Sequence, residues 1–321
     1  MTSQVASTAA APPSGARNTS MRTAAREKND EFYTQLQDIE DELKHYWPHL
    51  VGKTVFCNCD DPEKSNFWLY FTRNFEHLKL AKVVATHYTS VAPSYMLEYF
   101  GKDRPVVKSP LVGNGDFRSP ECVALLREAD LVVTNPPFSL FREYLAQLGE
   151  HKKKFLVIGS SSTVICKATF KLVKEGALWL GITAPKKFKQ PDGTLKQFGN
   201  ISWFTNLTHK KRNEAIVLFK RYAGNESEYP RFDNYDAINI AKVAHIPMDY
   251  TGFMGVPITF LEKFNPNQFE ILGLTNTGEE NPGIRLPGTE HGRALVDGRE
   301  IFTRILIRHV GHHTDHQPST S

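Results

Sequence analysis

Short β-rich runs alternate with helical stretches between residues 53 and 220, and this alternation constrains the fold more than any other feature. The runs that we predict as strands are 53–59, 82–86, 129–134, 154–159, 178–182, 201–206 and 215–220. Helices are predicted between them at 65–78, 119–128 and 139–148, with Pro120 in a first helical turn, where prolines are tolerated. The pattern predicts an α/β fold with a doubly wound, mostly parallel sheet.

Leu131, Val132 and Val133 form an unbroken hydrophobic run within one of these predicted strands. A strand that helices cover on both faces has this composition, whereas a half-exposed strand alternates. Residues that follow such a strand lie at the carboxyl edge of the sheet, where open α/β sheets bind their ligands. We therefore expect functional residues directly after it.

The tetrapeptide Asn135-Pro136-Pro137-Phe138 follows this strand. Two prolines fix the backbone and remove two N–H donors, so carbonyls stay free to accept, while Asn135 adds an amide oxygen and Phe138 an aromatic face. Such a set suits a planar ring that carries an amino group, and its hydrogen bonds would localise the nitrogen lone pair for attack on a sulfonium methyl group. A plain strand-ending turn is the alternative. Ser139 is predicted to cap the next helix.

Several longer segments resemble the N6-adenine DNA methyltransferases of the EcoRI methyltransferase family, whose cofactor motifs precede the catalytic turn. The resemblance covers nearly everything from residue 30 to 274, through segments 30–35, 57–62, 113–119, 134–140, 229–239 and 254–260. It implies a Rossmann-like fold and S-adenosylmethionine as methyl donor. It also implies that Asn135, Pro136, Pro137 and Phe138 are catalytic and that the substrate is an adenine flipped out of a specific double-stranded DNA sequence.

The resemblance assigns the cofactor to three segments. They are Phe32, Tyr33 and Thr34 over its methionine part; Asp60, Asp61 and Pro62 before a helix start that would meet its carboxylate; and Asp116 and Phe117 at its adenine. Without the resemblance, these are a helix start, capping aspartates and a Gly-Asp turn. The common glycine is missing after Pro62, and segment 86–88 offers no acidic residue for the ribose, so that contact stays unassigned.

Two basic stretches place cations beside aromatic residues, which suits phosphates and unstacked bases. The DNA-binding candidates are Lys186, Lys187, Lys189, Lys210, Lys211 and Arg212, with Lys196 between the stretches. Their position between late strands predicts that they lie near the carboxyl edge. Solvated loops are the alternative.

Changes in composition divide the chain. Residues 1–28 are predicted as a disordered tail, with an organellar transit peptide as the alternative, because segment 1–25 is rich in Ala, Ser, Thr and Pro and has no acidic residue. A catalytic domain is expected at 29–222. A smaller region at 223–310, with short strands at 255–260 and 301–307 and a loop at 276–296, would help to select the DNA sequence. Residues 311–321 are predicted as a second disordered tail.

Composition also excludes several classes. No apolar run is long enough for a membrane span or a signal peptide, so we expect a cytoplasmic protein. Four scattered cysteines favour neither a disulfide framework nor a zinc site. A terminal histidine group, His309, His312, His313 and His316, lacks further ligands, so no metal is predicted. The net charge of +4 fits a polyanionic partner but does not decide it.

Two other functions stay compatible with the turn. One is a methyltransferase for RNA bases or for protein glutamine, and the other is a DNA-binding protein without catalysis. The expected partner is double-stranded DNA, bound by a monomer, and a cognate restriction endonuclease would act separately.

Overall fold

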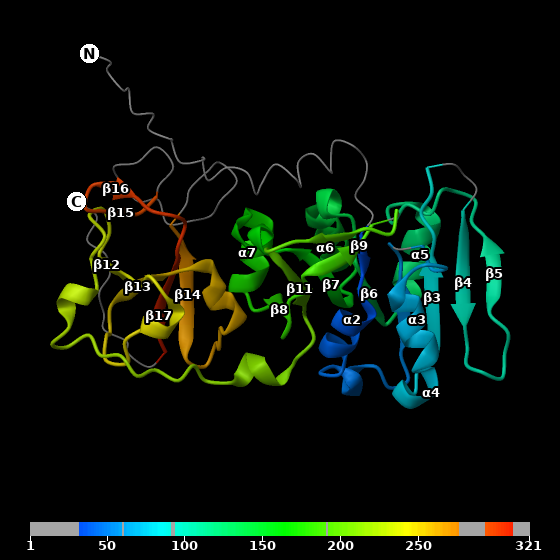
Figure 1. Ribbon diagram of the computed structural model, residues 1–321, viewed down its shortest axis with the longest axis horizontal. Helices are drawn as coiled ribbons and strands as arrows, with labels where there is room; N and C mark the ends of the chain where they lie inside the picture. The colour runs from blue at the N-terminus through cyan, green and yellow to red at the C-terminus, as the bar shows by residue number, and fades with distance from the viewer. Residues whose placement is uncertain (1–31, 60, 91–93, 191, 276–292, 311–321) are drawn as a thin grey trace, which may run out of the picture.

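An eight-stranded sheet forms the larger part of the computed structural model, which describes residues 32–59, 61–90, 94–190, 192–275 and 293–310 (Figure 1). The strand order is β5-β4-β3-β2-β6-β7-β11-β8. The four central strands β3, β2, β6 and β7 are parallel, which confirms the prediction for the middle of the sheet. The strand bounds are Thr54–Cys57 (β2), Lys82–Thr86 (β3), Tyr95–Tyr99 (β4), Val107–Pro110 (β5), Leu131–Thr134 (β6), Lys154–Ser160 (β7), Trp179–Leu180 (β8) and Ile201–Thr205 (β11).

The sheet is mixed rather than wholly parallel, because β4 and β11 run opposite to the other six strands. β4 pairs antiparallel with β3 and β5, and β11 pairs antiparallel with β7 and β8. Residues 87–94 join β3 to β4, and this connection is shorter than the dozen or more residues that a parallel crossover needs. The sequence analysis did not predict β4 and β5.

Helices cover both faces of the central strands. Val55 and Cys57 of β2 belong to a hydrophobic cluster with α2 (Leu36–Leu43), α3 (Asn66–Arg73) and α4 (Phe75–Leu78). Phe56, between them, belongs to a second cluster with α5 (Pro120–Glu128), α6 (Phe141–Glu150) and α7 (Lys167–Lys174). This alternation places one helical layer on each side of the sheet, because successive side chains of a strand point to opposite faces.

Two helix predictions need correction. The predicted helix at 65–78 is divided at Asn74, whose backbone leaves helical geometry while its amide nitrogen donates to the Tyr70 carbonyl at 2.9 Å. Ser139 does not cap α6, which begins at Phe141 after the short 3-10 helix Phe138–Leu140. The prolines lead the chain into that 3-10 turn first, and it is closed by the Leu140 amide donating to the Pro137 carbonyl at 3.0 Å. Helix α5 begins as predicted, with Ser119 as its cap.

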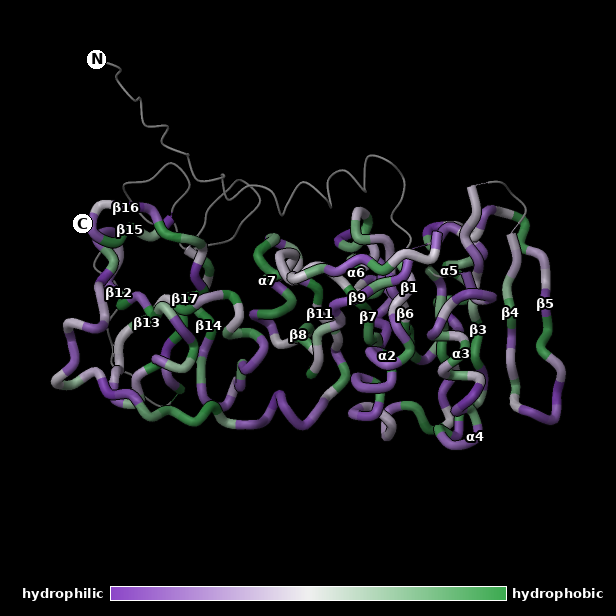
Figure 2. The backbone as a smooth tube through the Cα atoms, viewed as in Figure 1, coloured by the Kyte–Doolittle hydropathy of each residue, from purple (hydrophilic) through white to green (hydrophobic). Residues whose placement is uncertain are grey.

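A second sheet, with strand order β12-β13-β17-β14, lies at the other end of the molecule. Its strands are Ala237–Asn239 (β12), Phe253–Val256 (β13), Phe269–Leu274 (β14) and Ile305–His309 (β17), so the predicted strands at 255–260 and 301–307 are partly confirmed. A small ladder of Leu295–Val296 (β15) and Arg299–Glu300 (β16) lies beside it. α7 and this sheet share a hydrophobic cluster with the large sheet, and Figure 2 shows hydrophobic and hydrophilic segments alternating along α7.

The predicted strand at 215–220 is wrong. Instead of pairing in a ladder, Ile216 exchanges two hydrogen bonds with the side-chain amide of Gln268, at 2.7 and 2.9 Å, and Lys220 forms only an isolated bridge with Pro247. His309, one of the terminal histidine group, is buried in β17 with its Nε2 2.8 Å from the Pro247 carbonyl. Both predicted tails, most of the predicted loop at 276–296, and His312, His313 and His316 lie outside the described residues. Within the described ranges, no helix is long and apolar enough to cross a membrane.

Candidate active site

The candidate site lies at the carboxyl edge of the parallel strands, as the sequence predicts. Asn58 follows β2 directly and Asn135 follows β6, which is paired with it in the sheet. A three-stranded sheet of β1 (Tyr33–Thr34), β9 (Lys187–Lys189) and β10 (Leu195–Gln197) lies over this edge. Segments far apart in the sequence therefore meet at one place.

The orientation of the Asn135 side chain is fixed by one hydrogen bond. Its Nδ2 donates to the backbone carbonyl of Phe32. Because a carbonyl only accepts, the amide nitrogen must face Phe32, and Oδ1 is then directed away from it. Asn135 is only 6% exposed, and its Oδ1 has no hydrogen-bond partner among the described residues. The turn therefore presents a buried, oriented acceptor that the described part of the chain leaves unsatisfied.

Phe138 belongs to a cluster of four aromatic rings. Its ring stacks on Phe32, with centroids 5.9 Å apart and planes 19° apart, and meets the edges of Phe188 and Phe198 at 6.1 and 5.9 Å. Phe188 is fully buried, whereas Phe138 is half-buried. The aromatic face that the sequence analysis proposed for a planar ring is thus supported by three other rings, two of them on or beside the β9–β10 hairpin.

The segment Phe32–Thr34 lies at this edge: Tyr33 and Thr34 form β1, and α2 begins soon after them at Leu36, so the segment also precedes a helix start. β1 pairs antiparallel with β9, placing Thr34 opposite Phe188, and the Thr34 carbonyl accepts from the Asn66 amide at 2.7 Å. The segment therefore connects the start of α3 with the hairpin above the site.

The carboxylate of Asp61 is occupied by contacts within the protein. It accepts from the Tyr95 hydroxyl at 3.0 Å and the Glu63 amide at 3.1 Å, and lies 3.2 Å from the Lys64 ammonium. Burial alone would raise the pKa of Asp61, but these hydrogen bonds outweigh it and hold that pKa below the ordinary 3.8. Pro62 beside it is buried, and Asp60 lies outside the described residues.

Asn58 is a site residue that the sequence analysis did not single out. It is buried, its Oδ1 accepts from the Tyr144 hydroxyl, and its Nδ2 has no partner within the described chain. The hydroxyls of Thr34 and Thr134, at the same edge, are buried and have no partner among the residues described. Buried polar atoms are normally satisfied, so this concentration indicates a ligand that supplies the missing partners. In the sequence, Asn58 was indicated only by its position within segment 57–62, which resembles the methyltransferase family.

Asp116 and Phe117 are held tightly by their neighbours. Both oxygens of Asp116 accept from Arg118, at 2.9 and 2.7 Å, and this lowers the pKa of Asp116. The buried Phe117 ring meets the edge of Tyr144 at 5.0 Å, so the Tyr144 hydroxyl bond to Asn58 links this segment to the end of β2.

Gly115 permits the close approach of this loop to β3. It has a φ of +78°, and a Cβ there would stand 1.8 Å from the backbone oxygen of His87, which follows β3. The positive φ disfavours any other residue, and the clash with the His87 backbone excludes one. The glycine of the Gly-Asp-Phe motif thus has a steric reason.

The first basic stretch lies beside the site. Lys186, Lys187 and Lys189 are exposed on or next to β9, and the Lys196 ammonium lies 5.2 Å from the centroid of the Phe32 ring. Phe188 between the lysines points inward to Phe138. This hairpin therefore joins an exposed cationic surface to the aromatic cluster.

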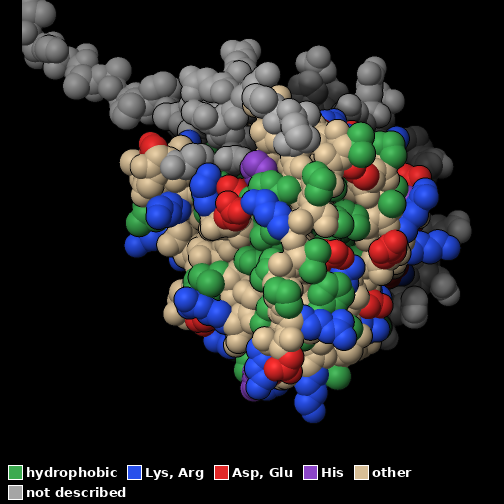
Figure 3. All heavy atoms as spheres, turned by 90° about the vertical axis from the view of Figure 1, so that its right-hand side faces the viewer, with side chains coloured by type: hydrophobic (Ala, Val, Ile, Leu, Met, Phe, Trp, Pro, Cys, Tyr) green, Lys and Arg blue, Asp and Glu red, His purple; other side chains and the backbone are tan. Residues whose placement is uncertain are grey.

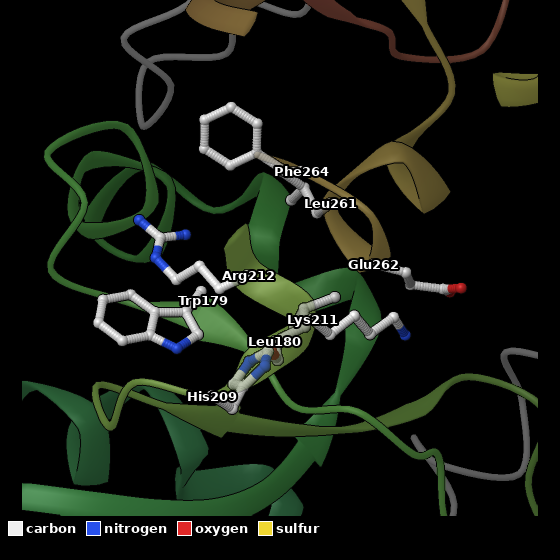
Figure 4. Close-up of a pocket in the computed structure, with 8 residues that line it drawn as sticks. All are labelled: Trp179, Leu180, His209, Lys211, Arg212, Leu261, Glu262 and Phe264. Carbon is white, nitrogen blue, oxygen red and sulfur yellow. The ribbon is translucent and has the colours of Figure 1, made fainter. Parts of the chain in front are cut away.

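The second basic stretch lies at the opposite edge, which corrects the predicted position. It follows β11, and because β11 runs antiparallel to β7, its end lies at the amino edge of the parallel strands. Arg212 stacks 4.1 Å above the Trp179 ring and the Lys211 ammonium donates to the Ile182 carbonyl at 3.1 Å, in a pocket that also includes Phe264 (Figure 4). Lys210 is exposed and lies 4.0 Å from Glu214. These contacts give Lys211 and Arg212 structural roles far from Asn135. Among the described residues, no three potential ligands gather to hold a metal.

An α/β sheet with an oriented, unsatisfied amide oxygen beside an aromatic face at its carboxyl edge has the arrangement of a methyltransferase that acts on amino groups. Comparison with known proteins defines the class further. A family described as "Adenine-specific methyltransferase EcoRI" matches residues 20–310. The chain belongs to this family, and adenine methylation is its activity.

Individual relatives agree with the family. The chain is 40% identical to the type II methyltransferase M.EcoRI of Escherichia coli, over 91% of this chain and 97% of the relative. It is 41% identical to M.MpnI of Mycoplasma pneumoniae, over 89% and 96%. It is 35% identical to M.MgeORF184P of Mycoplasma genitalium, over 89% and 97%. No solved structure matches the chain.

Proposed function

We propose that this enzyme transfers a methyl group from S-adenosylmethionine to the N6 amine of an adenine that is flipped out of a specific double-stranded DNA sequence. The observation that carries this proposal is the fixed amide of Asn135, whose Oδ1 is buried and has no partner in the part of the chain that the structure describes. An exocyclic amine would satisfy this oxygen and would be held in one orientation by it. Because the Phe32 carbonyl already fixes the amide, no reorganisation is needed as charge develops on the nitrogen.

Phe138 would stack on the adenine ring while Asn135 holds its amine. The half-buried Phe138 ring is supported by Phe32, Phe188 and Phe198, which restrict its motion. Stacking is worth about 1–3 kcal/mol per base and does not depend on base identity, so Asn135 and the backbone acceptors of the turn would provide the preference for an amino group.

The buried polar atoms at the carboxyl edge fit the methyl donor. Asn58, Thr34 and Thr134 each carry a buried side-chain atom without a partner among the described residues, and all three lie at this edge. These residues, with the start of α3 and the Asp116–Phe117 segment, would hold the cofactor. When bound, S-adenosylmethionine supplies an electrophilic sulfonium methyl group. Both carboxylate oxygens of Asp116 already accept hydrogen bonds from the Arg118 guanidinium, and this favours a positioning role for Asp116.

The sheet, with helices on both faces and its site at the carboxyl edge, supports a Rossmann-like, doubly wound methyltransferase domain at residues 29–222. Residues 223–310, which include the second sheet, would then help to select the DNA sequence. DNA is expected at the exposed lysines of β9, since the face that carries β4 and β5 shows Lys, Arg, Asp and Glu side chains interspersed (Figure 3). We propose a monomer, and a cognate endonuclease would act as a separate protein.

Sequencing of DNA from an expression host, with detection of modified bases, tests the proposal directly. N6-methyladenine should be found at one short sequence in cells with the wild-type chain and be absent with Asn135→Ala. A parallel assay of labelled methyl transfer to DNA, RNA and protein fractions separates the substrates. Label in RNA or protein alone would support the alternative methyltransferases, and DNA binding without any methylation would support the non-catalytic protein.

A further inference from the structure

The β9–β10 hairpin has two different faces. Phe188 of β9 is buried, while Lys187 and Lys189 on either side of it are exposed. In β10, Lys196 is half-buried opposite Phe188, whereas Leu195 and Gln197 are exposed. The inner face therefore packs on the aromatic cluster of the active site, and the outer face presents two lysines, a glutamine and a leucine to the solvent.

Leu195 is the apolar residue of that outer face. It is 62% exposed and lies opposite Lys189 in the ladder. A single exposed leucine is ordinary on a protein surface. The position of Leu195 is unusual, however, because its neighbour Lys196 pairs with Phe188, whose ring contacts Phe138. Leu195 is thus next to the strand pair Lys196–Phe188, which contacts the ring that we propose to stack on the flipped adenine.

Flipping a base leaves a gap in the DNA stack. The cost is a few kcal/mol, and proteins that distort DNA often fill such a step with an apolar side chain. Cations beside the wedge are needed to hold the flanking phosphates. The outer face of the hairpin combines these features, because Leu195 lies opposite Lys189 and near Lys187 on the hairpin whose inner face packs on the aromatic cluster of the site.

We propose that Leu195 enters the duplex at the position that the target adenine leaves, and so stabilises the flipped state. This inference rests on the proposed function, because it assumes a double-stranded DNA substrate. It assigns a role in base flipping to a residue outside the cofactor and catalytic motifs.

The test compares wild type with Leu195→Ala on two duplex oligonucleotides that carry the sequence methylated in the expression host. One duplex is fully paired, and the other has an abasic site opposite the target adenine, which lowers the cost of flipping. On the paired duplex, Leu195→Ala should reduce kcat/KM by about 10- to 100-fold, which corresponds to a loss of part of the flipping free energy. On the abasic duplex the two proteins should be within about threefold of each other. Leu195→Met should restore most of the activity on the paired duplex.

Two measurements separate a wedge from a structural role. Fluorescence of 2-aminopurine at the target position should rise on binding wild type and rise much less with Leu195→Ala. Val217→Ala is the matched control, since Val217 is also an exposed apolar residue but lies beyond the basic stretch at the opposite edge of the sheet, so it should match wild type. Equal loss on both duplexes, or an unchanged activity of Leu195→Ala on the paired duplex, would overturn the inference. Absence of DNA methylation by wild type would instead overturn the proposed function.

Discussion

The side-chain amide of Asn135 donates to the backbone carbonyl of Phe32, a residue 103 positions earlier in the chain. This bond joins the turn that we propose to be catalytic to the segment that we propose to bind the cofactor. It also fixes which atom of the amide faces away, so the orientation of the acceptor depends on where the segment Phe32–Thr34 lies.

Asn135→Ala removes the acceptor and should reduce kcat by about 10²- to 10³-fold, the usual effect of removing one preorganised hydrogen-bonding group. Asn135→Asp tests the orientation. It keeps an acceptor of the same shape, but its second oxygen would face the Phe32 carbonyl, where two acceptors repel each other. We expect this variant also to be slow, at neutral pH, in single-turnover methylation of DNA.

Calorimetric titration with S-adenosylmethionine provides the control for both variants, which should bind it with near wild-type affinity if Asn135 acts on the amine. Wild-type rates for Asn135→Asp would contradict an orienting role of the Phe32 carbonyl.

The turn Asn135–Phe138 could be proposed as the candidate site from the sequence because its information is local: a buried strand, two prolines, an amide and an aromatic ring are consecutive. The Phe32 carbonyl bond and the partners of Phe138 were not predictable in this way, since Phe32, Phe188 and Phe198 meet only through strand pairing. The predicted position of Lys210–Arg212 was wrong because β11 runs antiparallel to β7, and no local feature of the sequence indicates the direction of that strand. Asn58 was missed for a similar reason, since burial without a partner is a property of the folded chain.

The two basic stretches should differ in their effect on DNA affinity. The double variant Lys187→Ala/Lys189→Ala removes two exposed cations next to the site and should weaken binding. The slope of log affinity against log salt is negative, and each lost phosphate contact makes it less steep by about 0.9. The slope of the double variant should therefore be less steep than that of wild type by about 2. Fluorescence anisotropy with a labelled duplex at several salt concentrations measures this slope.

Lys210→Ala is the control for this measurement. Lys210 is exposed but lies at the opposite edge of the sheet, so its removal should leave the slope unchanged. A less steep slope for Lys210→Ala, with no change for Lys187→Ala/Lys189→Ala, would place the DNA at the amino edge instead.

Glu42 should be important for stability. It is fully buried in α2, and its carboxylate accepts from the Ile182 amide at 2.8 Å, the Thr183 amide and hydroxyl at 2.6 Å, and the Tyr46 hydroxyl at 2.8 Å. Glu42→Ala would leave these donors buried without an acceptor, so the free energy of unfolding should fall by about 3–5 kcal/mol in urea denaturation. Glu40→Ala changes an exposed glutamate of the same helix and should alter it by less than about 0.5 kcal/mol. Similar losses in the two variants would contradict this role.

The hydrogen bond from Tyr95 to Asp61 should make stability depend on pH in acid. The folded pKa of Asp61 is below its ordinary value of 3.8, so the unfolded chain binds the proton more readily. The contribution of this carboxylate to stability is therefore present above about pH 3.8 and is lost as the pH falls through the lower, folded pKa. Tyr95→Phe removes one of the hydrogen bonds that lower the pKa and should reduce the free energy of unfolding by about 1–3 kcal/mol at pH 6. This difference from wild type should shrink below pH 3.8, because a protonated carboxyl loses less when the hydroxyl is removed.

Tyr99→Phe, on the same strand, has no corresponding bond to a carboxylate among the described residues and should show no pH-dependent difference. A gap between Tyr95→Phe and wild type that stays constant from pH 6 to pH 3 would show that Asp61 is not the group responsible.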